Sequence, residues 1–208
     1  MIASGRAESV QRAQAVLPSP ALTAQTVDMR SEAAIRGFFE TAAPFDHVVY
    51  TAGENLVLGS LATTELRDAR AAFEIRYFGA LASAKFAAPV IRAGGSIVFT
   101  TGVAGARPGS GWTSGASITS AVEGLTRALA VELAPIRVNA VSPGVVRTPL
   151  WGAMSEAERQ ELYDSQAAQL PVGHVGEAGE IATAYLYLME NSYATGTVVV
   201  ADGGYLLV

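Results

Sequence analysis

The chain has 208 residues, of which 50% are hydrophobic and 16% are charged, and its net charge is −5 at pH 7. This length predicts one domain with a substantial core, and the composition is too apolar for a disordered chain. Because no basic block offsets the negative charge, the sequence argues against a nucleic-acid-binding function.

Metal sites and membrane attachment are not expected either. The chain has no cysteine, and its two histidines, His47 and His174, are too isolated to build a usual zinc site. No charged segment followed by a long apolar one opens the sequence, so we expect no secretory signal and no membrane anchor. A cytoplasmic location is the resulting expectation.

Short apolar, β-branched runs alternate with longer helical patterns, which predicts parallel strands joined by helical crossovers. The fold class is therefore α/β, with a single domain over residues 1–208. Ser155 and Glu158 have the spacing of a capping box that starts a short helix. The expected strands cover residues 22–27, 47–51, 96–101, 136–141 and 197–200. The expected helices cover residues 7–17, 32–41, 64–91, 116–133 and 177–189, and Gly94-Gly95 ends the third.

Two stretches combine a strand with a tight turn. Residues 45–53 form an apolar run that ends in Thr51-Ala52-Gly53, where small residues let the backbone approach a ligand closely. Residues 136–149 contain a strand, the turn Pro143-Gly144 and a following loop. With the strand and Asp-Gly-Gly turn of residues 195–204, and residues 172–177 before the last helix, they resemble the short-chain dehydrogenase/reductase family over essentially the whole chain.

The resemblance implies a Rossmann-like, doubly wound parallel sheet that binds NAD(P) at the carboxyl ends of its strands. Arg6 ends what looks like the family's second strand, where an arginine can meet the adenosine 2′-phosphate of NADP. As a solvated surface arginine it needs no such role, and that interpretation is favoured. The implied cofactor-binding residues are Arg6, Asp28, Thr51, Ala52, Gly53, Pro143, Gly144, Val146 and Thr148.

The first departure from the family is the missing first βα unit. In the family, a strand leads into a Gly-rich turn and a helix whose N-terminus holds the cofactor pyrophosphate. Without this unit, NAD(P) binding is expected to be weak or lost. Because the missing strand is central in the family, we expect residues 1–4 to move into its place or to lie beside the strand ending at Thr51. Either arrangement would give a six-stranded parallel sheet and avoid unpaired strand edges.

The second departure is the catalytic tetrad of Asn, Ser, Tyr and Lys. In the family, Tyr is the acid or base, Lys lowers its pKa, Ser stabilises the substrate oxygen and Asn positions a water. The equivalent positions here are Arg76, Gly102, Gly115 and Thr119. We therefore expect no catalytic tetrad, and the loss of the helix kink at the Asn position.

Nearby residues have both a functional and a structural interpretation. Thr101 lies one residue before the Ser position, but strand alternation turns it to the opposite face, and a hydroxyl satisfied by the backbone is favoured. Tyr77 lies on an apolar stripe, which favours packing in the core or an interface. Arg76 either recognises an anion or forms a helix-surface salt bridge.

The same two interpretations apply around the former Tyr position. Trp112 either covers a ligand or caps the core. Ser114 and Ser117 are explained as N-cap residues of the following helix. His47 and His174, with no carboxylate or nucleophile nearby in the sequence, are interpreted as structural or solvated.

Three hypotheses for function remain open. The first is a non-catalytic family member, a pseudoenzyme with a binding or assembly role that pairs with itself or with a catalytic relative. The second is an NAD(P)-dependent oxidoreductase with an atypical site around Thr101, Ser114, Ser117 or Arg76. The third is a family member whose true N-terminus lies upstream. We favour the first; the loop 150–170 carries no polar cluster that would name a substrate.

Assembly is expected as a homodimer or homotetramer. The helices over residues 73–88 and 116–133 are those that family members pack across a two-fold axis. The small residues Ala80, Ala84, Ala87 and Ala88 form a stripe that would allow close helix contact.

Overall fold

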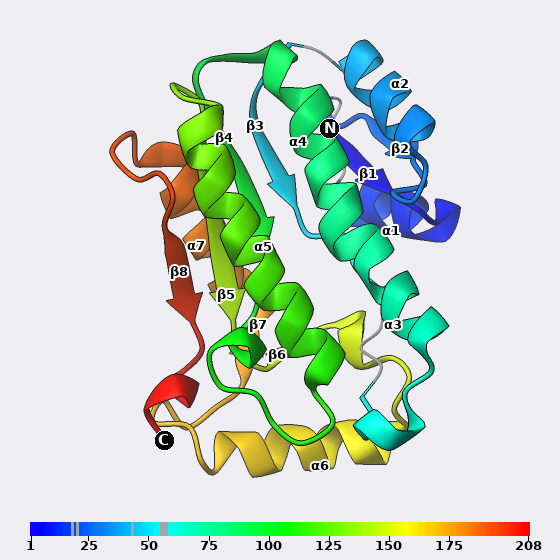
Figure 1. The fold of residues 1–208 in the computed structure, drawn as a ribbon, viewed down its shortest axis with the longest axis vertical. Helices are drawn as coiled ribbons and strands as arrows, with labels where there is room; N and C mark the ends of the chain where they lie inside the picture. Colours follow the sequence, from blue (N-terminus) through cyan, green and yellow to red (C-terminus); the bar gives the residue numbers. More distant parts are fainter. Residues whose placement is uncertain (18, 20, 43, 55–57) are drawn as a thin grey trace.

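The structure, a computed structural model, describes residues 1–17, 19, 21–42, 44–54 and 58–208. Its centre is a four-stranded parallel sheet in the order β3-β4-β5-β8, and β1 and β2 form a separate parallel pair beyond β3 (Figure 1). The sheet strands are β3 (Phe45–Tyr50), β4 (Ile91–Thr100), β5 (Arg137–Pro143) and β8 (Val198–Ala201). The remaining strands are β1 (Ile2–Ser4), β2 (Ala24–Thr26), and the paired β6 (Val146–Arg147) and β7 (Gly176–Glu177).

Helices cover both faces of the sheet. In Figure 1, α4 and α5 lie in front of the strands and α7 lies behind them, while α6 closes the lower end. The predicted α/β class is confirmed. Among the described residues, no helix has the length and apolar character needed to cross a bilayer. The helices are α1 (Ala7–Val16), α2 (Glu32–Ala42), α3 (Leu66–Phe73), α4 (Ala80–Ala87), α5 (Thr113–Glu132), α6 (Glu156–Ala167) and α7 (Ala178–Glu190).

The core is built on β4 and β5. Ile97 and Phe99 pack toward α4 and α5, whereas Val98 packs with Leu188 of α7 on the other face. All four side chains are completely buried. Both faces of β4 are covered, which explains why Ile97, Val98 and Phe99 form a continuous apolar run instead of an alternating one.

The N-terminal strand β1 occupies neither of the two positions predicted for it. β1 pairs with β2 in the register Ile2 to Ala24 and Ser4 to Thr26, and the amide of Val27 donates to the carbonyl of Ser4 at 2.9 Å. The expected six-stranded sheet is wrong. β1 and β3 are not paired with each other, so each has one edge without a strand partner among the described residues.

The stretch predicted as one helix over residues 64–91 is divided in two. A π-helical turn, Glu74–Gly79, separates α3 from α4, so the expected loss of the kink is wrong. The hydroxyl of Tyr50 donates to the carbonyl of Ile75 at 2.6 Å, and a Cβ on Gly79 would collide with that hydroxyl and lie 2.7 Å from the carbonyl oxygen of Met29. The π-helical turn therefore packs directly against Tyr50, and Gly79 permits this close approach.

Three local expectations have mixed outcomes. The capping box is confirmed, since the amide of Glu158 donates to Ser155 Oγ at 3.3 Å and Ser155 N donates to Glu158 Oε2 at 2.7 Å. The N-cap role for Ser114 and Ser117 is wrong, because α5 starts at Thr113 and both serines lie inside it. Likewise, Gly94-Gly95 does not end a helix, since β4 already begins at Ile91.

The alanine stripe does not form a surface. Ala80 and Ala84 are each 1% exposed and Ala87 is fully buried, because this side of α4 packs against the protein's own sheet and α2. The expectation that the stripe mediates contact between subunits is therefore wrong, and only Ala88 is partly accessible.

Candidate functional site

Two connected cavities lie along the carboxyl ends of the strands. The first, of about 950 Å³, lies between β1 and β3, and we call it the strand slot. The second, of about 570 Å³, lies over the ends of β4 and β5, and we call it the carboxyl-edge cleft. Both are lined by Arg6, Thr51, Gly53 and Glu54, so they form one continuous depression. Crevices outside the carboxyl ends of parallel strands are the usual ligand sites of such folds.

All residues predicted to bind the cofactor line this depression, in two groups. Arg6, Asp28, Thr51, Ala52 and Gly53 line the strand slot. The second group lines the carboxyl-edge cleft and consists of Pro143, Gly144, Val146 and Thr148.

Two of these residues have local structural duties. Asp28 Oδ1 accepts a hydrogen bond from the amide of Arg30 at 2.9 Å, which fixes the turn after β2. A Cβ on Gly144 would lie 2.9 Å from Asp202 Cα, so this glycine is required by the close approach of the Asp-Gly-Gly turn. These local contacts are sufficient to explain the aspartate at position 28 and the glycine at position 144.

The four tetrad-equivalent positions, Arg76, Gly102, Gly115 and Thr119, all line the carboxyl-edge cleft. Thr119 Oγ1 donates within α5, to the carbonyls of Gly115 at 3.1 Å and Ala116 at 3.0 Å. Thr101 Oγ1 donates to the carbonyl of Thr119 at 2.9 Å, as the structural interpretation of Thr101 predicts. Both hydroxyl protons are therefore engaged by the backbone.

Arg76 combines the two interpretations offered for it, because it forms a salt bridge inside the cleft. Its Nη2 donates to the carbonyl of Glu54, and its Nε lies 3.9 Å from Glu54 Oε2. The side chain is 23% exposed, and burial lowers the pKa of Arg76 while the charge of Glu54 opposes that shift. The guanidinium also lies against Gly53, where any Cβ would touch it.

The other residues singled out from the sequence divide between cleft and core. Trp112 lines the cleft and packs on the cluster around Trp151. Tyr77 packs on the main core. His47 Nδ1 lies 2.9 Å from Ser96 Oγ, and His174 Nε2 lies 3.8 Å from a carboxylate oxygen of Glu180, so both histidines have structural partners that the sequence did not indicate.

Tyr185 is a cleft residue that sequence reasoning missed. Its hydroxyl lies 2.7 Å from Thr100 Oγ1, and Thr100 in turn donates to the carbonyl of Tyr50 at 2.9 Å. Because the Thr100 hydroxyl donates to Tyr50, Thr100 Oγ1 accepts the hydrogen bond from the Tyr185 hydroxyl. Burial raises the pKa of Tyr185. Tyr185 lies in an apolar helix pattern that indicated only packing, so no sequence signal pointed to the cleft.

The predicted cofactor-binding residues are distributed over both parts of this depression. Asp28 lines the strand slot, Arg6 lines both cavities, and Pro143 and Gly144 line the carboxyl-edge cleft. Pyrophosphate needs free backbone amides at a glycine-rich helix start. In the part of the chain that the structure describes, the two cavities share Arg6, Thr51, Gly53 and Glu54 as lining residues, and Arg76 is paired with Glu54 on the cleft side.

Comparisons with known proteins agree with this architecture. A family model described as enoyl-(acyl carrier protein) reductase matches residues 2–206. Short-chain dehydrogenase/reductase ATR9 of Stachybotrys chlorohalonatus is 36% identical over 98% of this chain and 84% of its own length.

Solved structures extend the comparison to the fold. A small-chain dehydrogenase in complex with NADPH has a TM-score of 0.89 and 36% identity, with 100% of this chain and 98% of that chain covered. MalC reductase/Diels-Alderase from Malbranchea aurantiaca has a TM-score of 0.90 and 27% identity, with 99% and 86% covered. The chain belongs to the short-chain dehydrogenase/reductase family.

Proposed function

We propose that this chain is a non-catalytic member of its family, in which the depression serves binding or assembly instead of hydride transfer. The observation that carries the proposal is the convergence of Arg76, Gly102, Gly115 and Thr119 on one cleft. Two of these positions have no side chain, the hydroxyl of Thr119 is bound within its helix, and Arg76 is paired with Glu54. No group at these positions can exchange a proton with a substrate near neutral pH.

The proposal includes weak binding of NAD(P). Arg6 and Asp28 would meet the adenosine and Pro143 and Gly144 the nicotinamide, but the pyrophosphate has no dedicated cradle among the described residues. The small-chain dehydrogenase in complex with NADPH supports NADPH as the ligand to test first.

The experiment is a calorimetric titration of the chain with NADH and NADPH, followed by addition of carbonyl substrates while the nicotinamide absorbance is recorded. Weak binding without turnover supports a binding role, and no binding supports an assembly role. Binding with substrate-dependent turnover contradicts the proposal.

A pair of arginine variants sharpens the titration. Arg6→Ala removes the arginine that lines both cavities, and Arg92→Ala removes an exposed arginine that pairs with Asp46 at 2.9 Å on the far side of β3. If Arg6 meets the 2′-phosphate, Arg6→Ala weakens NADPH binding and leaves NADH binding unchanged, while Arg92→Ala alters neither. Equal effects of the two variants would show that Arg6 has no specific contact with the cofactor.

The second candidate is an oxidoreductase with an atypical site. Its support is the reductase and dehydrogenase names of the relatives, together with the cation that Arg76 places in the cleft. The two candidates differ in whether NADPH is consumed in the presence of a carbonyl substrate.

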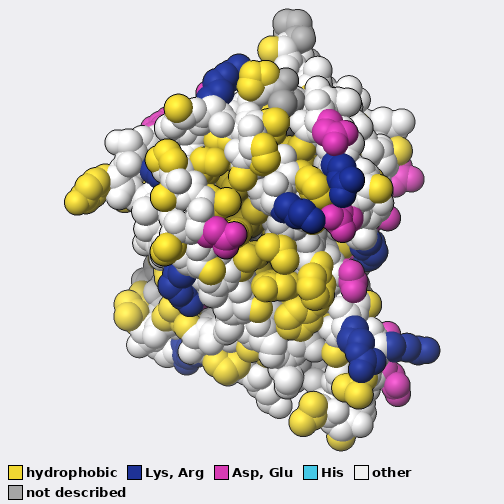
Figure 2. Space-filling view, turned by 45° about the horizontal axis from the view of Figure 1, so that its top comes forward, with side chains coloured by type: hydrophobic (Ala, Val, Ile, Leu, Met, Phe, Trp, Pro, Cys, Tyr) yellow, Lys and Arg dark blue, Asp and Glu magenta, His cyan; other side chains and the backbone are white. Residues whose placement is uncertain are grey.

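We also propose a homo-oligomer, or a pair with a catalytic relative, as the assembled state of one domain over residues 1–208. The support is a set of exposed apolar side chains on α3, the π-helical turn and α5, where Leu66, Phe78 and Val131 are 68%, 51% and 81% exposed. Figure 2 shows several groups of apolar side chains on one face of the molecule, with charged side chains between and beside them. Light scattering tests this state, and a monomer mass at micromolar concentration contradicts it.

A further inference from the structure

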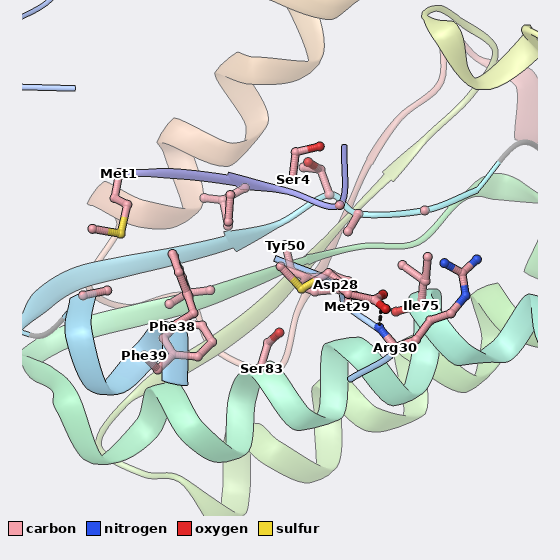
Figure 3. A pocket seen from close by; sticks show the side chains of 18 of the residues that line it. Met1, Ser4, Asp28, Met29, Arg30, Phe38, Phe39, Tyr50, Ile75 and Ser83 are labelled. Atoms are coloured by element: carbon pink, nitrogen blue, oxygen red, sulfur yellow. Dashed lines mark hydrogen bonds between the residues drawn. The ribbon is translucent and has the colours of Figure 1, made fainter. Parts of the chain in front are cut away.

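The carboxyl-edge cleft is positively charged, although the chain as a whole has a net charge of −5. The charged side chains among its described lining residues are three arginines and one glutamate, namely Arg6, Arg76, Arg107 and Glu54. The described lining of the strand slot carries two arginines and two carboxylates, and Figure 3 shows Asp28 and Arg30 close together there. An excess of cations in a partly enclosed cleft favours an anionic ligand.

Arg76 has hydrogen-bond donors that the protein leaves unused. A guanidinium carries five N–H groups. Among the described residues, Arg76 donates only to the carbonyl of Glu54, and its Nε lies 3.9 Å from Glu54 Oε2, which is beyond hydrogen-bond distance. The Arg76 side chain is only 23% exposed, so water reaches few of the remaining donors. Because buried donors normally have acceptors, Arg76 is expected to bind an acceptor group that enters the cleft.

A carboxylate is the acceptor that suits Arg76 best. The planar guanidinium presents parallel N–H groups that match the two oxygens of a carboxylate. Glu54 does not form this pair, and its Oε2 is itself buried without a hydrogen-bond partner among the described residues. A ligand carboxylate would therefore make hydrogen bonds to Arg76 that Glu54 does not supply.

Arg107 supplies a second positive charge, from the loop between β4 and α5. Its Nη1 donates to the carbonyl of Tyr205, and its guanidinium lies 4.9 Å from the centre of the Tyr205 ring. Both residues line the cleft. These contacts hold the cation at the cleft, where it attracts an anion.

Much of the remaining cleft wall is apolar and aromatic. Both tryptophans of the chain line it, Trp112 directly before α5 and Trp151 in the turn after β6. The aliphatic side chains of the wall include Ile118, Val122, Leu150, Leu162 and Ile181. The volume of about 570 Å³ equals that of about 19 water molecules at about 30 Å³ each, which gives room for a ligand of about that many non-hydrogen atoms. Such walls favour an aromatic ring system.

We propose that the carboxyl-edge cleft binds an aromatic monocarboxylate. Its rings pack on the apolar walls, and its carboxylate pairs with Arg76 in competition with Glu54. The inference rests on the proposed function, because it names the ligand class of the same non-catalytic cleft.

The test titrates the full chain with biphenyl-4-carboxylate and with biphenyl-4-carboxamide, an uncharged counterpart of equal size. Since both tryptophans line the cleft, tryptophan fluorescence reports binding there. We expect saturable binding of the carboxylate, at least about tenfold tighter than that of the amide, because only the carboxylate forms a charge-assisted pair. Equal affinities for the two compounds would overturn the proposal.

Arginine variants locate the carboxylate. Arg76→Ala is expected to weaken carboxylate binding about tenfold and to change amide binding by less than about twofold. Arg127→Ala removes an arginine of α5 that pairs with Glu123 and does not line the cleft, so neither affinity is expected to change.

Arg76→Lys keeps a cation beside Glu54 in case the alanine variant does not fold. It is expected to weaken carboxylate binding about threefold, because an ammonium lacks the planar fork of donors. Carboxylate binding that neither Arg76 variant weakens would overturn the proposal.

Glu54→Gln tests the competition for Arg76, with an effect of opposite sign. The variant removes the competing charge and keeps the main-chain carbonyl that accepts the hydrogen bond from Arg76. We expect carboxylate binding to become about threefold tighter and amide binding to stay unchanged. Weaker carboxylate binding by this variant would contradict the competition and overturn the proposal.

Two further measurements separate this inference from its alternatives. Inorganic pyrophosphate that displaces the bound carboxylate at a comparable concentration would assign the arginines to phosphoryl groups and overturn the proposal. NADPH turnover with carbonyl substrates is recorded independently. Turnover contradicts the proposed function, whereas a missing preference for the carboxylate contradicts this inference alone.

Discussion

The central sheet and the N-terminal β1–α1–β2 unit are both parallel β structure, yet they differ in burial. Val138, Ala140 and Val141 of β5 are fully buried. No residue of β1 or β2 is fully buried, and two of the three residues of β2 are exposed. β4 and β5 are paired on both edges and have helices on both faces, whereas among the described residues β1 and β2 pair only with each other.

This difference separates what holds the molecule together from what is available for binding. Stability is expected to concentrate in residues 95–99 of β4 and residues 137–142 of β5, all of which are buried. In the described part of the chain, β1 and β3 each have one edge without a strand partner, and these edges lie beside the depression that forms the candidate site. The region with the weakest packing is therefore the one with the capacity to recruit a ligand.

The largest expected effect compares two phenylalanines. Phe99→Ala removes a fully buried ring from the central sheet and is expected to lower the free energy of unfolding by about 3–5 kcal/mol. Phe38→Ala removes a partly exposed ring from the slot wall and is expected to cost less than about 2 kcal/mol. Denaturant unfolding measures both, and equal losses would mean that the slot is closed in solution.

The next effect compares two helical glycines. Gly79→Ala would push a Cβ against the Tyr50 hydroxyl and the carbonyl of Met29, so we expect a loss of about 1–3 kcal/mol. Gly124→Ala, on α5, has no atom within 4 Å of the new Cβ and is expected to gain about 0.4–1 kcal/mol. The same denaturation experiment decides the signs. A stabilising Gly79→Ala would show that the π-helical turn does not need this glycine.

A smaller effect concerns pH and the edge strand β3. Burial lowers the pKa of His47 from its ordinary value of 6.5, the charge of Arg137 adds to this, and Asp46 opposes it. The unfolded chain then binds the proton more readily, so the stability is complete above about pH 6.5 and falls as the pH drops toward the lower folded pKa.

The measurement for His47 is unfolding at about pH 7.5 and about pH 5.5. His47→Gln is expected to lose less stability between the two values than the unmodified chain does. If both lose the same amount, the acid sensitivity comes from other groups.

The last comparison is expected to show no effect on carbonyl reduction. Gly102→Ser, Gly115→Tyr and Thr119→Lys together rebuild three tetrad side chains, and the backbone has room for the first two, whose Cβ atoms would have nearest neighbours at 3.5 Å and 3.9 Å. We still expect no carbonyl reduction, because the pyrophosphate cradle remains missing among the described residues. Turnover by this triple variant would show that the tetrad alone was limiting.

The sequence predicted the local elements well where a strand and its turn are encoded together. The Pro143-Gly144 turn and the Ser155 capping box were predicted from neighbouring residues alone. The π-helical turn was not predictable, because it depends on a hydroxyl 25 residues away in the chain. Similarly, the pairing of β1 depends on β2, and the position of Tyr185 at the cleft depends on how α7 packs.

The most direct test of the central claim is NADPH consumption by the unmodified chain with a panel of carbonyl substrates. A positioned general acid contributes about 10²- to 10⁴-fold and an oxyanion donor about 10²- to 10³-fold, so their loss removes on the order of 10⁴ to 10⁷ in rate. We predict no consumption above the rate without protein. Steady, substrate-dependent consumption that is abolished by Arg76→Ala or Thr101→Val would contradict the account and establish an atypical enzyme.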